Sequence, residues 1–474
     1  MYSVPAAAQD WEIEPYIEVI ATYTDNLYLL QKGFEISDYV GQVNPGINIV
    51  RNDGRFTTDT SYRMQNLFFA DDSDLDTIFH QLNSSSTLEL AAETFFIDVD
   101  AAIEQSILDP TRPISTSNVI TTSNYGDVIY ADINPYLVQR LGNSSAYARV
   151  DYTWGIGRYE DFGLQTFSRV DDFDQESWRA YLGTAQQETG FDWALTYDRQ
   201  FVNYETISDY KFERAGAMTA IPLMRNIRLL LLGGFESDVF VGRDIGGLDS
   251  DYWEVGFSVN SGERNNFEVR VGERFFGRSY FGNFEYEGNN ISATISYTEN
   301  PTTSALSGPG SFDADFSVSD LDPIFDEDLA GDELIIVPIR AEAYISKMLS
   351  ARIEVSGARS LLFLAYADED REFIDLVDGL AGQEDGQDSL TLGYRYELGS
   401  RTELEFSVAT GRYDYPFTDV HSDVVQIVLG VSRRLGSQTD LRASIRRSEQ
   451  EIDNVSGFGD YVENAIEVGL VRRF

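Results

Sequence analysis

Hydrophobic and polar residues alternate along most of this chain, in runs of about ten residues that end at turn-forming residues. The clearest runs begin at Trp253, Phe267, Ile291, Leu441 and Ile466. Successive side chains of a β-strand point to opposite faces, so each run predicts a strand with one apolar face and one polar face. The spacing typical of amphipathic helices is nearly absent, and the chain is therefore expected to be all-β.

The connections between these runs alternate in length. Tight turns containing Gly, Asn or Ser are predicted at several places, including residues 52–54, 348–350 and 398–400. Longer loops, several of them acidic, are predicted at residues 70–77, 108–126, 303–332 and 367–388. Short periplasmic turns and long extracellular loops are typical of outer-membrane barrels. The pattern predicts a single transmembrane antiparallel β-barrel of about 22 strands, with a range of about 18–22 and both termini on the short-turn side.

Other architectures fit the pattern less well. Transmembrane helices are not expected, because no stretch approaches the roughly 18 consecutive apolar residues that a crossing requires. A soluble β-sandwich or propeller would also contain alternating strands, but the chain lacks an internal repeat and its loop lengths alternate. We assign residues 11–474 to the barrel. Residues 1–10 are expected to be a residual signal or processing segment, since Ala6 and Ala8 form an Ala-x-Ala pair.

The last eight residues, EVGLVRRF, resemble the assembly signal at the end of outer-membrane barrels. Glu467, Gly469 and Phe474 hold the polar, glycine and terminal aromatic positions of that signal. Arg472 departs from it, because an apolar residue is usual at the third position from the end. The resemblance implies that the barrel-assembly machinery is a partner of this chain.

Charge and composition exclude several kinds of function. A net charge of −44 argues against a nucleic-acid partner, because phosphate binding needs a basic surface. The absence of Cys excludes disulfides and thiolate metal sites, and 13% aromatic residues are too many for a disordered chain. His80 and His421 are the two histidines, and no recognisable catalytic or metal-binding motif contains them. We therefore expect no enzyme and no resident cofactor or metal.

Basic residues on the polar phase of the strands are the candidate binding residues. This phase faces the lumen of a barrel, since a charge on the lipid face costs about 2–4 kcal/mol near the midplane. The candidates are Arg270, Arg274, Arg340, Arg442 and Arg446. The same phase carries Glu268, Glu342, Glu405 and Glu467. Two interpretations stay open, an arginine ladder that contacts an anionic polymer and a mixed-charge lumen whose cross-strand pairs satisfy one another.

Residues 253–303 resemble the core of the PEP-CTERM-system-associated outer-membrane β-barrel proteins. The resemblance is carried by GERFFGRSY at residues 272–280 and SYTENPTT at residues 296–303. PYIEVIATYTDNLYL at residues 15–29 and the segment 342–366 are similar to other parts of that family. The resemblance implies a link to exosortase-associated loci and a role in passing exopolysaccharide across the outer membrane of a Gram-negative bacterium.

Three functions follow as hypotheses from these observations. The first is a conduit for export of exopolysaccharide, with periplasmic polysaccharide-export proteins as possible partners. The second is a general diffusion porin for small solutes. The third is a plugged barrel that acts as a structural anchor or an enzyme. Outer-membrane lipid and lipopolysaccharide are expected around any of them, with the acidic loops either solvated or bridged by divalent cations. Residues 303–332 are expected to decide between these functions, because a loop that folds inward would constrict the pore.

Overall fold

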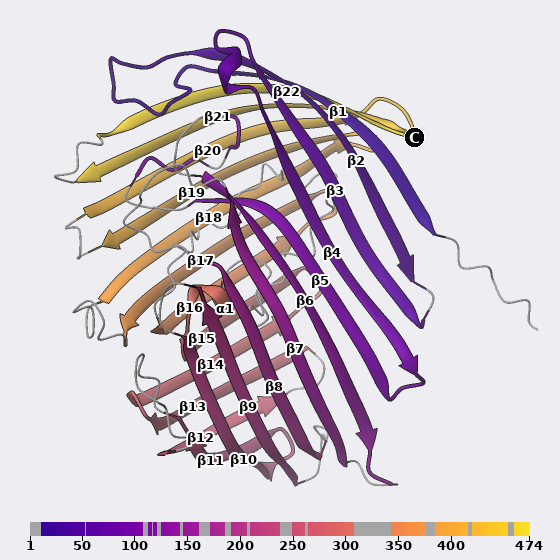
Figure 1. The fold of residues 1–474 in the computed structure, drawn as a ribbon, viewed down its shortest axis with the longest axis vertical. Coiled ribbons are helices and arrows are strands. Elements are labelled where there is room, and N and C mark those ends of the chain that lie inside the picture. The colour runs from indigo at the N-terminus through magenta and orange to yellow at the C-terminus, as the bar shows by residue number, and fades with distance from the viewer. Residues whose placement is uncertain are drawn as a thin grey trace, which may run out of the picture.

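The computed structural model describes residues 11–52, 54–107, 112–115, 117–120, 125–142, 146–160, 171–184, 191–205, 209–237, 249–260, 264–307, 343–374, 384–415, 420–453 and 459–474. Within these residues, 22 strands form one antiparallel sheet that closes on itself (Figure 1). Each strand pairs with its neighbours in sequence, and β1 (Glu12–Thr24) also pairs with β22 (Tyr461–Arg473). The predicted barrel and its predicted number of strands are confirmed.

The strands contain 10 to 16 residues, enough for a tilted crossing of a bilayer. After β1, the first half of the sheet contains β2 (Asp38–Asn52), β3 (Phe56–Phe69), β4 (Thr77–Ala91), β5 (Phe95–Ile107), β6 (Tyr125–Arg140), β7 (Ala146–Glu160), β8 (Phe173–Thr184), β9 (Asp192–Tyr204), β10 (Tyr210–Met224) and β11 (Ile227–Glu236). The second half contains β12 (Ser250–Asn260), β13 (Asn265–Arg274), β14 (Gly277–Glu287), β15 (Ile291–Thr302), β16 (Tyr344–Ser356), β17 (Ser360–Phe373), β18 (Glu384–Gly399), β19 (Thr402–Tyr415), β20 (Val420–Arg434) and β21 (Thr439–Asp453), before β22.

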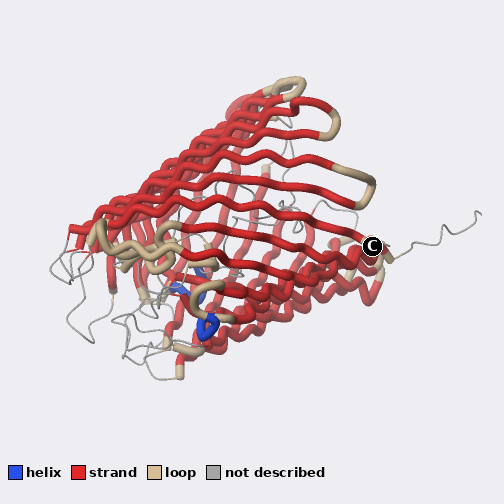
Figure 2. The backbone as a smooth tube through the Cα atoms, turned by 90° about the horizontal axis from the view of Figure 1, so that it is seen from above, coloured by secondary structure: helices blue, strands red, loops and turns tan. Residues whose placement is uncertain are grey.

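Both ends of the barrel sheet lie at its short-turn end. β1 and β22 pair over nine residues, from Tyr16 opposite Arg473 to Thr24 opposite Ala465. The backbone N–H of Phe474 donates to the carbonyl of Pro15 at 2.9 Å, which extends the ladder beyond the last strand. The C-terminus therefore lies with the short connections, on the right of Figure 2, and the long connections lie at the opposite end. Residues 1–10, the expected signal segment, lie outside the described residues.

Two predicted connections are wrong in position. Residues 348–350 lie inside β16, and the turn follows at Gly357, whose N–H donates to the carbonyl of Ser360 at 2.6 Å. The acidic stretch 367–388 is also mostly strand, because β17 continues to Phe373 and β18 begins at Glu384. Both faces of these strand ends are polar, so the period of two is hidden there although the ladder continues, for example from Asp368 to Asp388.

The outer face of the barrel is apolar. Leu362 and Leu364 on β17 and Leu390 and Leu392 on β18 are all about two-fifths exposed, as expected for side chains that point toward lipid. The chain exposes 24966 Å² in total, whereas a compact soluble protein of its 53.3 kDa would expose about 18,000 Å². This excess agrees with a hollow barrel whose inner wall is also accessible.

Helical structure is confined to two short elements among the described residues. A 3-10 helix, η1 (Ser73–Leu75), follows β3, and α1 (Ser304–Ser307) follows β15. Neither element is long or apolar enough to span a membrane. α1 lies on the inner side of the sheet and therefore occupies part of the lumen.

Candidate functional site

Uncharged polar side chains line the lumen on β18 to β22 and on β1 to β3. Gln65 on β3 donates through Nε2 to Oε1 of Gln42 on β2 at 3.0 Å. Gln450 on β21 donates in the same way to the hydroxyl of Ser422 on β20 at 2.7 Å. The positions that carry this lining include Asn44, Gln387, Ser389, Thr391, Ser407, Gln426 and Ser448, all of them buried against neighbouring side chains. Amides and hydroxyls thus form a hydrogen-bonding wall, in which paired charges such as Arg446 with Glu463 are interspersed.

Paired charges line the lumen on β10 to β13. The Arg270 guanidinium lies 2.7 Å from the Glu254 carboxylate and 2.9 Å from that of Glu268. Glu254 also binds Arg214, at 3.2 Å, so that one carboxylate joins β10 and β13 through β12. The Arg270 guanidinium lies over the ring of Phe281 at 3.8 Å as well. Each of these cations is engaged by a neighbouring strand.

Arg274 closes a gap between two strands. β14 and β15 pair only from Gly282 opposite Tyr297 to Glu287 opposite Ser292, so residues 277–281 have no partner on β15. Arg274, on β13, donates to the carbonyl of Glu299 at 2.9 Å and to the Glu236 carboxylate at 3.1 Å. The Glu299 carboxylate in turn accepts the N–H of Tyr280 at 3.2 Å. Side chains therefore replace the missing ladder bonds, and the segments 272–280 and 296–303 meet at this gap.

The remaining candidate residues are spread around the barrel. Arg446 on β21 binds Glu463 on β22 at 3.1 Å, and Arg442 lies opposite Ser432 and Gly469 in the ladder. Glu405 pairs with Arg395 at 3.2 Å, and Glu467 accepts the Thr22 hydroxyl at 3.3 Å across the closing strands. Arg340 and Glu342 lie outside the described residues. The lumen charges are thus dispersed over several paired groups, and contact of the five arginines with a polymer stays a prediction.

The predicted assembly signal is placed at the closing edge of the sheet. Glu467 and Gly469 lie on the lumen face of β22, and Phe474 follows that strand with 67% of its surface exposed. A Cβ at residue 469 would lie 3.4 Å from Cγ1 of Ile20, an ordinary van der Waals contact, so the packing of β1 against β22 does not require glycine here. Recognition of these residues by assembly machinery stays a prediction.

Part of the connection between β5 and β6 crosses the loop end of the lumen. The N–H of Ile114 donates to Oε1 of Gln450 on β21 at 2.9 Å, and the hydroxyl of Tyr461 on β22 donates to the Ile114 carbonyl. Ile114 packs against Tyr413 and Val424, and Val119 packs in a second cluster with residues of β2 and β3. Sequence analysis identified the loop 108–126 but not this fold. Three apolar residues in a polar loop, at 114, 119 and 120, were the available signal.

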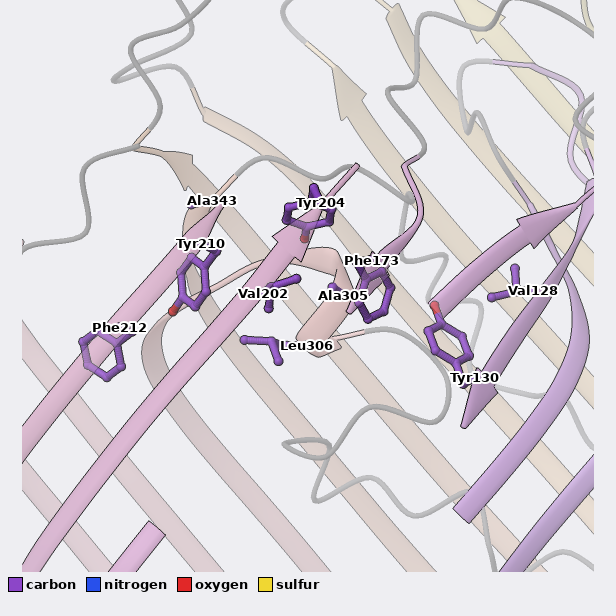
Figure 3. Close-up of a cluster of buried hydrophobic side chains, with 10 residues drawn as sticks. All are labelled: Val128, Tyr130, Phe173, Val202, Tyr204, Tyr210, Phe212, Ala305, Leu306 and Ala343. Carbon is purple, nitrogen blue, oxygen red and sulfur yellow. The ribbon is translucent and has the colours of Figure 1, made fainter. Parts of the chain in front are cut away.

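A second segment enters the lumen after β15. Figure 3 shows Ala305 and Leu306 of α1 packed with Val202 and Tyr204 of β9, inside a larger apolar cluster. The hydroxyl of Tyr204 donates to Oγ1 of Thr303 at 3.0 Å, which fixes the start of α1. The cluster also contains Val128, Tyr130, Phe173, Tyr210, Phe212 and Ala343. The loop predicted to decide the function therefore begins by folding inward, and residues 308–342 lie outside the described residues.

Both histidines lie on the outer face, away from the lumen. His80 Nδ1 lies 2.7 Å from the Tyr62 hydroxyl, and His421 Nδ1 lies 2.5 Å from the Asp414 carboxylate. Within the described parts of the chain, no three His, Asp or Glu side chains converge closely enough to hold a metal ion.

Comparison with solved structures supports the architecture. The ferric-catecholate import receptor Fiu from E. coli K12 is similar over 97% of this chain and 81% of the receptor, with a TM-score of 0.51 and 8% identity. This chain has the fold of an outer-membrane β-barrel. The siderophore receptor PirA from Acinetobacter baumannii is similar over 97% of this chain and 80% of the receptor, with a TM-score of 0.49 and 7% identity. Pseudomonas aeruginosa OccK2 (OpdF), crystallised with glucuronate, covers 98% in both directions with a TM-score of 0.37 and 10% identity.

Identities of this size show the fold alone. No protein-family model matches the barrel, and no curated protein matches its sequence.

Proposed function

We propose that this barrel is a conduit through which exopolysaccharide leaves the cell across the outer membrane. The observation that carries the proposal is the lumen lining. Hydroxyl and amide groups are frequent on β18 to β22 and β1 to β3, and the charges there and on β10 to β13 are largely paired with one another. Such a wall exchanges hydrogen bonds with a polyhydroxyl chain without holding it by strong charge attraction, and a conducting site must bind weakly enough to release.

The resemblance of residues 272–280 and 296–303 to the PEP-CTERM-system-associated barrels supports the same proposal. These two segments meet at the gap between β14 and β15, where Arg274 and Glu299 hold the strands together. The segment 296–303 also leads directly into α1, and Tyr210 holds this segment by donating to the Pro301 carbonyl at 3.1 Å. The proposal includes periplasmic polysaccharide-export proteins as partners at the short-turn end.

A general diffusion porin is the second candidate. It is favoured by the segments that narrow the loop end, residues 112–115, residues 117–120 and α1, because a constriction limits the size of diffusing solutes. The two candidates differ in their response to a glycan. A conduit binds a passing oligosaccharide for long enough to interrupt the ion current, whereas a diffusion porin conducts steadily in its presence.

Planar-bilayer conductance of the purified barrel tests the proposal. We expect an ion current from the wild type, a larger current after deletion of residues 303–332, and transient blocks when maltoheptaose is added. A current that maltoheptaose does not interrupt in either form would favour the diffusion porin. A barrel closed in both forms would contradict both transport functions and favour the structural anchor.

A further inference from the structure

Three aspartates on the lumen face of β5 and β6 lie together without a cation between them. Asp98 and Asp100 are alternate residues of β5, and Asp100 stands directly opposite Asp132 on β6. The residues between them, Val99 and Ile133, are about two-fifths exposed on the outer face. Like charges directly opposite each other destabilise a sheet, so this arrangement is costly unless something else satisfies it.

Several oxygens in this acidic patch have no hydrogen-bond partner. Oδ2 of Asp132 and Oε1 of Gln175 are without one among the described residues, although the two side chains are 94% and 93% buried, with exposures of 6% and 7%. Oδ1 of Asp98 and Oδ1 of Asn134 are also buried without a hydrogen-bond partner. Buried acceptors are normally satisfied, so a group of them in one place needs an explanation.

Gly155 on β7 opens the space between the two buried side chains. It stands opposite Asp132 on one side and opposite Gln175 on the other. A Cβ at Gly155 would lie 2.9 Å from Nε2 of Gln175 and 3.2 Å from Cβ of Asp132. Gln175 therefore extends over Gly155 toward the acidic patch, and any larger residue at this position would displace it.

The nearest cations are engaged elsewhere. Arg149 binds Asp151 at 2.6 Å, and Arg179 stands opposite both Asp151 and Asp198 in the ladder. Within the described residues, no ion pair joins Asp98, Asp100 or Asp132 to a basic side chain. The unpartnered oxygens can accept hydrogen bonds, and a donor from a ligand would satisfy them.

Aromatic rings flank the acidic patch along the same strands. Toward the short-turn end, Phe96 and Tyr136 stack at 5.0 Å with an interplanar angle of 11°. Toward the loop end, Tyr130 and Phe173 lie 6.1 Å apart in the cluster of Figure 3, where they are 7% and 1% exposed and their faces are already covered. The Arg149 guanidinium lies 4.5 Å from the centre of the Tyr136 ring, which leaves the face of Phe96 beside the acidic patch. A flat apolar face beside hydrogen-bonding groups suits a ligand that has an apolar ring face and a polar edge.

We propose that the acidic patch, formed by Asp98, Asp100, Asp132 and Gln175, is a binding site for a neutral or amino-bearing glycan. The hydroxyl and amino groups of the glycan donate to the carboxylates of Asp98 and Asp100, which are half-buried, and a sugar ring stacks on Phe96. Acidic glycans are repelled by the same carboxylates. A metal ion does not fit, because these carboxylates do not converge on one point. This inference rests on the proposed function and names its substrate class.

Isothermal titration calorimetry of the detergent-solubilised barrel tests the site directly. The probes are maltoheptaose as a neutral glycan, chitosan hexamer as an amino-bearing glycan and hexagalacturonate as an acidic glycan. The wild type is expected to bind the first two and to bind hexagalacturonate at least about tenfold more weakly. Asp132→Asn keeps the size of the side chain but removes its charge, and we expect it to weaken binding of chitosan hexamer by about tenfold.

The matched control is Glu285→Gln, which removes one lumen carboxylate on β14, far from the acidic patch, and should leave both affinities unchanged. Gly155→Leu gives a second variant of the site, because its side chain fills the space between Asp132 and Gln175. Equal binding of all three glycans, or affinities that Asp132→Asn and Gly155→Leu do not change, would overturn the inference. Planar-bilayer conductance of the same samples separates the two proposals. If the barrel conducts and glycans block it equally in the wild type and in the two patch variants, the conduit is supported and the binding site is contradicted. If the barrel does not conduct but glycan binding depends on the patch, the binding site is supported and the conduit is contradicted.

Discussion

The lumen faces of β10–β13 and of β5–β8 both carry closely spaced charges but use them in opposite ways. On β10–β13 the sign alternates across neighbouring strands, so that Arg214, Glu254 and Arg270 neutralise one another. On β5 and β6 an acid stands opposite an acid, Asp100 beside Asp132, and within the described residues neither pairs with a basic side chain, while Oδ2 of Asp132 has no hydrogen-bond partner. Alternation of sign holds strands together, whereas repetition of one sign leaves groups free for a ligand.

This difference changes which lumen residues are expected to meet a substrate. Arg274 is 5% exposed, and its donors are occupied by Glu236, the Glu299 carbonyl and Asn300. We therefore expect Arg274 to contribute mainly to the stability of the barrel. The acidic patch on β5 to β8 is expected to affect binding much more than stability.

The largest expected effect concerns the gap between β14 and β15. Glu236→Ala leaves the buried Arg274 guanidinium without its carboxylate, and we expect it to lower the free energy of unfolding by about 3–5 kcal/mol. Urea unfolding in lipid vesicles, followed by tryptophan fluorescence, measures this. Glu273→Ala, the same change at an exposed position of β13, is the control and should stay within about 0.5 kcal/mol of the wild type. Equal stability of the two variants would show that the paired wall does not hold the strands.

A smaller effect is expected from loosening the segment that crosses the lumen. Ile114→Ala removes part of a buried contact with Tyr413 and Val424, which should weaken docking of residues 112–120 by about 2 kcal/mol. Single-channel recordings should then show a larger or noisier current. Ile78→Ala, which shortens an apolar side chain on the outer face, serves as the control. A current identical to the wild type after Ile114→Ala would mean that this segment does not limit conduction.

The smallest expected effect is an increase in stability. Asp100→Asn relieves the repulsion with Asp132, and we expect a gain of up to about 1 kcal/mol in the free energy of unfolding. The gain should shrink at high salt, because ions screen the repulsion. Asp440→Asn is the matched change at a carboxylate that is paired with Arg473, and it should lower stability. Loss of stability in both variants would contradict the contrast between the two walls.

The general architecture could be predicted from the sequence because it depends on local repetition. The alternation in runs such as the one from Phe267 predicts the strands. Arg270 and Arg446 lie on the polar phase of their strands, which predicts that their side chains face the lumen. The turn expected at residues 348–350 was wrong because Met348 and Leu349 continue an ordinary alternation, one toward the lumen and the other toward lipid. The real turn at Gly357 lies only a few residues further on.

The pairing within the lumen could not be predicted, because it depends on the register between strands. Glu254 meets Arg270 only because Gly256 stands opposite Arg270 in the ladder. The inward folds of α1 and of residues 112–120 depend on contacts with strands far away in sequence, such as Ile114 with Gln450. Asp98 and Asp100 are visible in the sequence, but that Asp132 rather than a basic residue stands opposite Asp100 is visible only once the neighbouring strands are in place.

Ion selectivity tests the contrast between the two lumen walls most directly. The measurement is the reversal potential of the wild-type barrel across a KCl gradient in a planar bilayer, compared with a variant that carries Asp98→Asn, Asp100→Asn and Asp132→Asn. Because the arginines on β10–β13 are neutralised and these aspartates are not, the wild type should prefer K⁺ to Cl⁻. The triple variant should lose most of that preference. A wild type that prefers Cl⁻, or a preference for K⁺ that survives the three substitutions unchanged, would contradict this account of the lumen.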